Sequence, residues 1–361
     1  MEERRYDIDW IRVIAIGLLL VYHVAIGFQS WGVLIGFITA ERSWPSLWIP
    51  MSMLNVWRIP LLFFVSGMGV CFALRRRTWA RLLPERARRI LLPFLFGMIA
   101  VVPLHSYLWQ VHQGFETDYR PGPGHLWFLG NLFVYVLLLM PLFQHLKRNR
   151  VVSQKDLTAR EKMPFVQRAA GWMRSPLGLL PVVALFVLEA LLLGPQPFEM
   201  YAMTWHGFFL GLLAFFFGFF FVWCGSVFWN MLLRWKWLFL ALAAGLFVVR
   251  ITLLGVPAPN YLVSIESNCW VLTVFAFGYH GLNRPSKVLR YLSQAAYPVY
   301  IIHMVFLYLG SLFIFRLDLP VQVQFALLLL FTLAGCLAFY ELVIRRVCFI
   351  RPLFGLKTDN P

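Results

Sequence analysis

Ten apolar runs, each about as long as a bilayer is thick, constrain this chain more than any other feature. A transmembrane helix needs roughly 20 apolar residues, and in lipid only helices and closed barrels satisfy all their backbone groups. The sequence therefore predicts an all-α membrane protein, a bundle of about ten transmembrane helices. The runs lie at 10–30, 47–74, 90–111, 126–146, 177–194, 207–229, 237–255, 262–282, 295–315 and 321–344.

Basic residues gather in every second connection between these runs. If the N-terminus is cytosolic, the inside segments hold 27 of the 32 Lys and Arg residues, eight of them in the loop 147–176. Such an excess marks cytosolic segments, so both termini are predicted to be cytosolic. The five other basic residues, which lie outside or within spans, are Arg42, Arg58, Arg120, Arg250 and Arg316.

The composition agrees with this class. With 60% hydrophobic and only 13% charged residues, a soluble fold is excluded. The net charge of +16 follows the topology pattern, so no nucleic-acid partner is expected. The five cysteines form no CxxC pair, so we expect no metal site. We expect one integral membrane domain over 1–361, with its core at about 7–346 and a short cytosolic tail at 347–361.

The first span carries ionisable residues on one stripe. Arg12 and His23 are eleven residues apart, which in a helix is about three turns and roughly 16 Å of rise. Asp9 lies one turn before Arg12 on much the same face. Charged groups within a span are costly and mark functional sites by default. The stripe therefore suggests proton chemistry in a buried tunnel.

Arginines mark two further places. Arg58, at about mid-depth of the second span, must face the interior and meet a partner, either in a structural ion pair or at the site. Ser66 and Gly67, which follow it, let helices approach closely or line a cavity. The segment 75–89 holds seven arginines, which either anchor the topology on anionic lipid or bind a phosphate-bearing donor.

Other polar residues lie near the outer ends of spans or at depth. His125 opens the fourth span, and His303 lies near mid-depth of the ninth; each is either a site residue or a structural histidine. Glu266 could pair with Arg58 or Arg250, or contact a substrate. Glu189 and Glu341, near span ends, are expected to face the membrane interface.

Four motifs, in this order, resemble the acyltransferase type 3 family of polytopic membrane proteins. They are R-x10-H in the first span, a basic residue followed by PLLFFVSG in the second, R-x-x-R before the third and YPVYIIH in the ninth. The resemblance covers essentially the whole chain, and the expected ten spans fit it. Within the family, HLWFL at 125–129 and IES at 265–267 look closest to the glucan succinyltransferase branch.

The resemblance implies an O-acyltransferase of the bacterial inner membrane. It would move an acetyl or succinyl group from cytosolic acyl-coenzyme A to a hydroxyl of an extracytoplasmic or lipid-linked glycan, with no permanently bound cofactor. The family's catalytic histidine maps onto His23, which as a general base would take the proton of the sugar hydroxyl. The family's first-span arginine maps onto Arg12.

The remaining roles follow from charge and depth. Arg12, Arg86 and Arg89 would hold the donor's phosphates, because guanidinium groups pair well with phosphate. Arg58 or His303 would stabilise the charge that develops on the thioester oxygen. His125, Glu266 and Asp9 are expected to contact the acceptor.

A transport function is the alternative to acyl transfer. A proton-coupled secondary transporter, or an exporter of a small polar or anionic substrate, would also need buried His, Arg and Glu. However, the sequence shows no paired halves with matching broken helices. A scaffold protein would not explain buried charge on one stripe. Within the acyltransferase reading, direct transfer and an acyl-enzyme route are both open.

Overall fold

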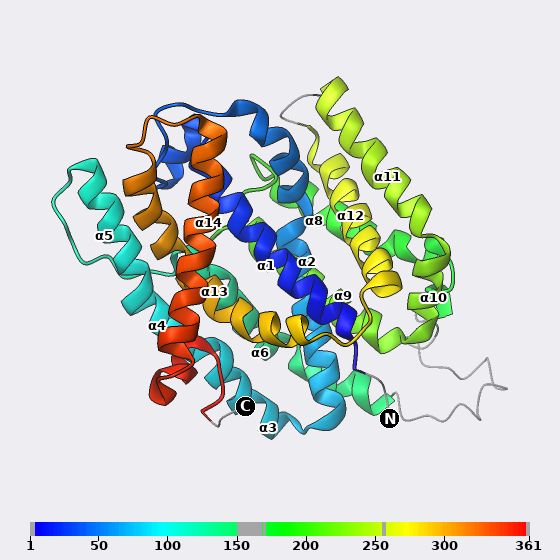
Figure 1. Ribbon diagram of the computed structural model, residues 1–361. Helices are drawn as coiled ribbons and strands as arrows, with labels where there is room; N and C mark the ends of the chain where they lie inside the picture. Colours follow the sequence, from blue (N-terminus) through cyan, green and yellow to red (C-terminus); the bar gives the residue numbers. More distant parts are fainter. Residues whose placement is uncertain (1–3, 150–167, 169–170, 255–257, 359–361) are drawn as a thin grey trace. The chain divides into compact units, whose positions relative to one another are not determined.

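The computed structural model describes residues 4–149, 168, 171–254 and 258–358. Within these residues every regular element is a helix (Figure 1), which confirms the predicted all-α class. Most of the loop 147–176 lies outside the described residues. The side of the membrane that each end faces stays a prediction.

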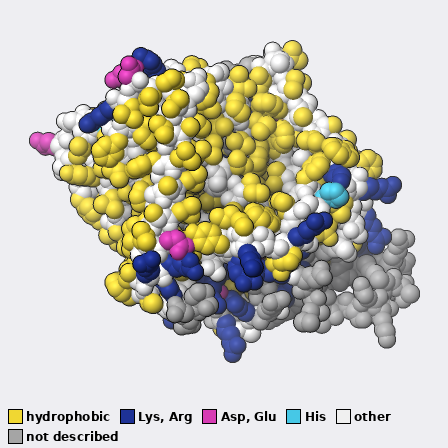
Figure 2. Space-filling view, viewed as in Figure 1, with side chains coloured by type: hydrophobic (Ala, Val, Ile, Leu, Met, Phe, Trp, Pro, Cys, Tyr) yellow, Lys and Arg dark blue, Asp and Glu magenta, His cyan; other side chains and the backbone are white. Residues whose placement is uncertain are grey.

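Ten helical segments of the described chain are long and apolar enough to cross a bilayer, as predicted. Hydrophobic side chains cover most of the face in Figure 2, as expected for helices that contact lipid. The segments are Tyr6–Ile26, Pro45–Arg75, Trp79–Gln113, Gly124–Lys147, Pro176–Leu193, Trp205–Cys224, Lys236–Leu254, Asn260–Gly281, Lys287–Ile314 and Val321–Ile344.

The described residues pack into two compact units that interleave along the chain. Unit 1 comprises Met1–Ile11, Val56–Pro84 and Asn131–Pro285, and unit 2 comprises Arg12–Asn55, Glu85–Gly130 and Ser286–Pro361. Helices α1 (Tyr6–Ile26), α2 (Trp48–Arg76), α3 (Trp79–Arg86) and α6 (Trp127–Asn149) contribute residues to both. That these units form one functional domain stays a prediction.

Unit 1 contains the fifth to eighth spans. Helices α11 and α12 pack side by side (Figure 1), and α8 contacts both α9 and α12. Its further helices are α8 (Leu180–Leu193), α9 (Trp205–Cys224), α10 (Ser226–Arg234), α11 (Lys236–Val249) with the π-helical turn η9 (Arg250–Leu254), and α12 (Asn260–Gly281).

Two glycines let α2 and α9 cross at backbone contact. A Cβ added to Gly67 of α2 would lie 1.9 Å from the carbonyl oxygen of Phe215, and one added to Gly218 of α9 would lie 2.0 Å from that of Phe64. Any side chain at either position would force the helices apart. Of the two roles expected for Gly67, the structure shows close helix packing.

Unit 2 contains the third, ninth and tenth spans. The third span is a helix interrupted by π-helical turns. It begins at Trp79, earlier than the start predicted at residue 90. Helices α13 and α14 pack side by side. The elements are η3 (Ala87–Leu91), α4 (Leu92–Phe96), η4 (Gly97–Val101), α5 (Val102–Gln113), α13 (Lys287–Ile314), α14 (Val321–Phe339), η10 (Tyr340–Ile344) and η11 (Cys348–Phe354), of which η3, η4 and η10 are π-helical turns.

A proline in α2 is compensated by side chains of unit 1. Pro60 has no N–H to donate to the carbonyl of Val56, one turn earlier. The hydroxyls of Ser267 and Tyr201 donate to this carbonyl instead, at 2.7 and 3.1 Å. These two side chains therefore replace the donor that the Val56 carbonyl lacks, in the turn that carries Arg58.

We expect Ser267→Ala to lower the stability of the protein by about 1 kcal/mol, since one donor to the Val56 carbonyl is lost. In a Pro60→Ala background, where a backbone N–H is restored, the same substitution should cost less. Thermal unfolding of the four purified proteins in detergent measures this coupling. Equal costs in the two backgrounds would contradict the compensation.

Candidate functional site

Four histidines from different segments meet in unit 2. They are His23 of α1, His105 of α5, His125 of the short 3-10 helix η5 (Gly124–Leu126) and His303 of α13. The ring of His303 lies 5.1 Å from that of His23, stacked at 4°, and 5.0 Å from that of His125. The rings of His125 and His105 are 5.4 Å apart. This cluster is the candidate functional site, and we call it the histidine cluster.

Hydrogen bonds order the two histidines first expected at membrane depth. Nδ1 of His303 lies 2.7 Å from the backbone oxygen of Tyr300, and Nε2 of His303 lies 2.8 Å from Nδ1 of His23. A carbonyl oxygen only accepts, so Nδ1 of His303 carries the proton and donates. In neutral His303 the lone pair is then on Nε2.

The hydrogen bond to His303 also fixes the tautomer of His23. Because Nε2 of His303 accepts, Nδ1 of His23 must donate to it. Neutral His23 therefore keeps its lone pair on Nε2. This is the arrangement that a general base requires: one nitrogen is oriented by a fixed acceptor, and the other is basic.

The third histidine is anchored to the same helix. His125 donates from Nε2 to the carbonyl of Ile301 at 2.9 Å, and its own carbonyl accepts from the hydroxyl of Tyr300 at 2.6 Å. Its Nδ1 therefore holds a lone pair when the ring is neutral. Among the described residues this buried atom has no hydrogen-bond partner, so it could accept from a ligand hydroxyl.

His105 was not predicted as a site residue. Its side chain is buried, and its ring also contacts Tyr308 at 5.3 Å. Within the described chain its Nδ1, like that of His125, lacks a hydrogen-bond partner. The sequence signal was only a histidine inside a span, as for His303, and no motif singled it out.

Aromatic groups surround the histidine cluster. The ring of Phe37, which is buried, lies 5.8 Å from that of His23 and 6.0 Å from that of Tyr308. The hydroxyl of Tyr308 donates to the carbonyl of Gly36, which fixes the loop that carries Phe37. Such walls lower the local dielectric constant and strengthen the hydrogen bonds inside.

The predicted donor-binding arginines also belong to unit 2. Arg12 is exposed and lies eleven residues before His23 in the unbroken helix α1, as the spacing predicts. That this stripe lines a buried tunnel stays a prediction. Arg86 ends α3, and Arg89 lies in the π-helical turn η3, where it pairs with Glu85 at 3.5 Å. Their binding of phosphate stays a prediction.

The other predicted site residues belong to unit 1. Asp9 accepts from Nη2 of Arg4 at 2.9 Å in an exposed pair. Arg58 is 2% exposed and lies in the turn of α2 that contains Pro60. Its role at the thioester and the acceptor contact of Asp9 stay predictions.

Glu266 forms a buried two-point ion pair. Its two carboxylate oxygens accept from Nε and Nη2 of Arg250 at 2.6 and 2.9 Å, and both residues are buried. Of the two partners expected for Glu266, the structure shows Arg250. A structural role for Glu266 is thereby supported, and its predicted contact with the acceptor stays a prediction.

A second buried pair in unit 1 corrects an expectation. Glu189 does not face the membrane interface: it is buried and lies 2.9 Å from Nδ1 of His206. A histidine at the start of the next span provided the partner, which spacing within one helix could not reveal. In the loop between these two spans, burial raises the pKa of Glu199, while a hydrogen bond to its own backbone and the charge of Arg250 oppose the rise.

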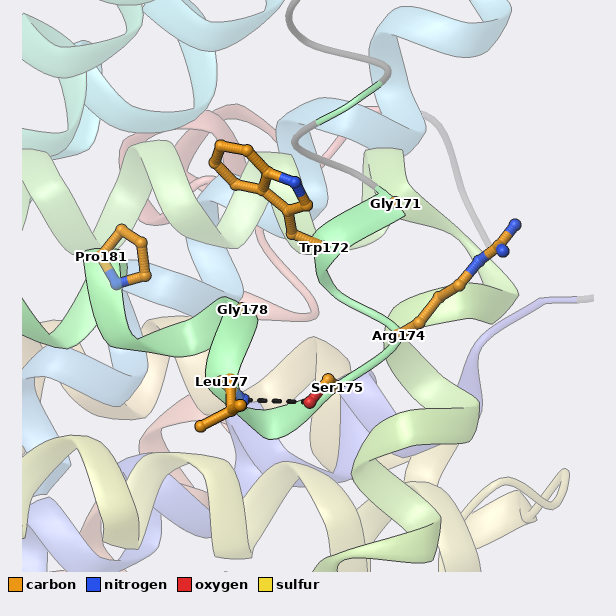
Figure 3. A pocket seen from close by; sticks show the side chains of 7 residues that line it. All are labelled: Gly171, Trp172, Arg174, Ser175, Leu177, Gly178 and Pro181. Carbon is orange, nitrogen blue, oxygen red and sulfur yellow. Dashed lines mark hydrogen bonds between the residues drawn. The ribbon is translucent and has the colours of Figure 1, made fainter. Parts of the chain in front are cut away.

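Unit 1 also has an open pocket of about 360 Å³ before α8 (Figure 3). None of the predicted site residues lines it. The hydroxyl of Ser175 accepts from the backbone N–H of Leu177 and so caps the turn, while the side chain of Arg174 points away from these two residues. The mainly apolar lining gives this pocket no evident chemistry.

We expect Glu266→Gln to destabilise the protein by about 3–5 kcal/mol, because it leaves the buried charge of Arg250 without its counter-charge. The double variant Arg250→Met, Glu266→Leu should lose less than this single variant, since it removes both charges. Denaturant unfolding of the purified proteins tests the order. A single variant as stable as the parent would show that Glu266 does not offset a buried charge.

Comparison with known proteins identifies the class. The model of a family described as an acyltransferase domain matches residues 5–341, nearly the whole chain. The family resemblance noted in the sequence is thus confirmed. No match was found among curated proteins or solved structures, and the glucan succinyltransferase branch stays a prediction.

Proposed function

The chain belongs to this acyltransferase family and is an integral, multi-pass membrane protein, and from this premise we propose that it transfers an acyl group from acyl-coenzyme A to a glycan hydroxyl with His23 as general base. The hydrogen-bond order from the Tyr300 carbonyl through His303 to His23 carries the proposal. It leaves the basic lone pair of His23 on Nε2, the nitrogen that would receive the proton.

The reaction balances with the groups of this chain and the two substrates. Nε2 of His23 takes the hydroxyl proton while the hydroxyl oxygen attacks the thioester carbonyl carbon. The carbon–sulfur bond then breaks, and the leaving thiolate takes the proton from His23. The products are an ester and free coenzyme A, and His23 returns to its neutral tautomer.

His303 and Arg58, both predicted to act on the thioester oxygen, have different roles in the proposal. Neutral His303 donates from Nδ1 to Tyr300 and accepts at Nε2 from His23, so it has no N–H left for the thioester oxygen. We therefore assign His303 to positioning His23 and stabilising its protonated form. Arg58 is retained as the proposed stabiliser of the developing oxyanion.

We assign binding residues to each substrate from the chemical groups that it carries. Arg12, Arg86 and Arg89 would hold the donor's phosphates at the predicted cytosolic side. Nδ1 of His125 would accept from a hydroxyl of an extracytoplasmic or lipid-linked glycan. The acyl group is acetyl or succinyl. For the carboxylate of a succinyl group, Arg250 is a weaker candidate partner than Arg58, because Glu266 already binds Arg250 at two points.

We expect His23→Ala to fold, to bind acyl-coenzyme A and to transfer nothing, because the hydroxyl is a poor nucleophile without a base. Transfer by purified protein in detergent is measured with acetyl- and succinyl-coenzyme A, and glycans from cells carrying the variant are compared by mass spectrometry. His112→Ala, at an exposed histidine of α5, is the matched control. Wild-type turnover by His23→Ala would contradict the proposal, whereas transport without transfer would favour the transporter.

His303 acts through His23, so its effects should not add to those of His23. We expect His303→Ala to lower kcat by about 10²-fold or more with little change in KM, in the range of a general-base contribution. The double variant His23→Ala, His303→Ala should be no worse than His23→Ala alone. Further loss in the double variant would give His303 an independent catalytic role.

A further inference from the structure

Tyr297 of α13 carries a buried hydroxyl that no group of the described chain satisfies. Among the described residues its Oη has no hydrogen-bond partner and is closed to solvent. The tyrosines further along the helix differ: Tyr300 donates to the carbonyl of His125 and Tyr308 to that of Gly36. Buried hydroxyls are normally paired, so an unpaired one indicates a missing partner.

The ring of Tyr297 packs closely against the C-terminal segment. Gly355 follows η11 with φ of 72°, and a Cβ there would lie 2.3 Å from Cε1 of Tyr297. The same Cβ would lie 3.1 Å from the carbonyl oxygen of Arg89. The tyrosine is therefore packed beside the turn that carries a predicted phosphate-binding arginine.

The C-terminal segment is itself firmly packed in unit 2. The ring of Phe354 lies 5.5 Å from that of Phe96 and 6.2 Å from that of Phe339. Arg351 is buried and donates to the carbonyl of Arg345. The segment from η11 to Gly355, which follows the residues matched by the family model, thus packs against α4, α14 and the ring of Tyr297.

The position of Tyr297 along α13 relates it to the path of the donor. It precedes His303 by six residues, which is about 9 Å of helical rise. It therefore lies between the level of the histidine cluster and the end of the helix that is predicted to be cytosolic. A donor whose phosphates are bound at that end and whose thioester reaches His23 must place its pantetheine arm at this level.

We propose that the hydroxyl of Tyr297 binds an amide of the pantetheine arm of acyl-coenzyme A. The arm carries two secondary amides between the phosphates and the sulfur, and each needs hydrogen bonds when it leaves water. A phenol hydroxyl can donate to the amide oxygen or accept from its N–H. The inference rests on the proposed function and adds a donor-binding residue to it.

The test uses Tyr297→Phe, which removes one oxygen and keeps the ring against Gly355. We expect KM for acyl-coenzyme A to rise about 3- to 10-fold, the value of one neutral hydrogen bond, with kcat unchanged. Tyr107→Phe, at an exposed tyrosine of α5, is the matched control. Because the substitution removes an unpaired polar atom, the variant should be at least as stable as the parent.

A truncated donor separates the arm from the phosphates. With acyl-pantetheine, which lacks the nucleotide and its phosphates, the effect of Tyr297→Phe should persist and that of Arg89→Gln should vanish. An unchanged KM in Tyr297→Phe, or an effect seen only with the full coenzyme A donor, would overturn the inference while wild-type transfer still supports the proposed function. Absence of transfer by the wild type would overturn both.

Discussion

The backbone oxygen of Tyr300 can only accept a hydrogen bond, and the order of the histidine cluster depends on this. It fixes the proton of His303 on Nδ1, and through Nε2 of His303 it fixes that of His23. The side chain of Tyr300 and the next carbonyl, that of Ile301, hold His125. One turn of α13 thus sets the orientation of three imidazoles, two of which present a defined lone pair.

Backbone groups that lose their helical partner explain other polar side chains. Pro103 has no N–H to donate, and two carbonyls of the π-helical turn before it accept from the following loop: that of Met98 from the backbone N–H of Gly122 at 3.2 Å and that of Ile99 from the hydroxyl of Tyr119 at 2.8 Å. Ser267 and Tyr201 serve the same purpose at Pro60. A polar residue within a span is a functional candidate by default, but these side chains replace missing N–H donors. The hydroxyl of Tyr297 differs because within the described residues it donates to no such acceptor.

The ten spans could be predicted because hydrophobic length is a local property of the sequence. The stripe of Arg12 and His23 could be predicted for the same reason, since helical geometry places residues eleven apart on one face. The meeting of His23 with His303 depends on packing between helices 280 residues apart, and spacing contains no information on it. His105 was missed and Glu189 misplaced because their partners lie on other helices or loops.

A histidine in place of a carboxylate behind the base suits a site at membrane depth. A carboxylate would make His23 more basic, but it would add a resting charge that low dielectric makes costly. Neutral His303 orients His23 through one hydrogen bond and leaves the resting pair uncharged. In the proposed reaction Nε2 of His23 would take the proton, so positive charge would appear on His23 as negative charge develops on the thioester oxygen. In the proposed transition state the two charges would then arise together, on His23 and on the thioester oxygen, and the resting histidine pair would itself carry no charge.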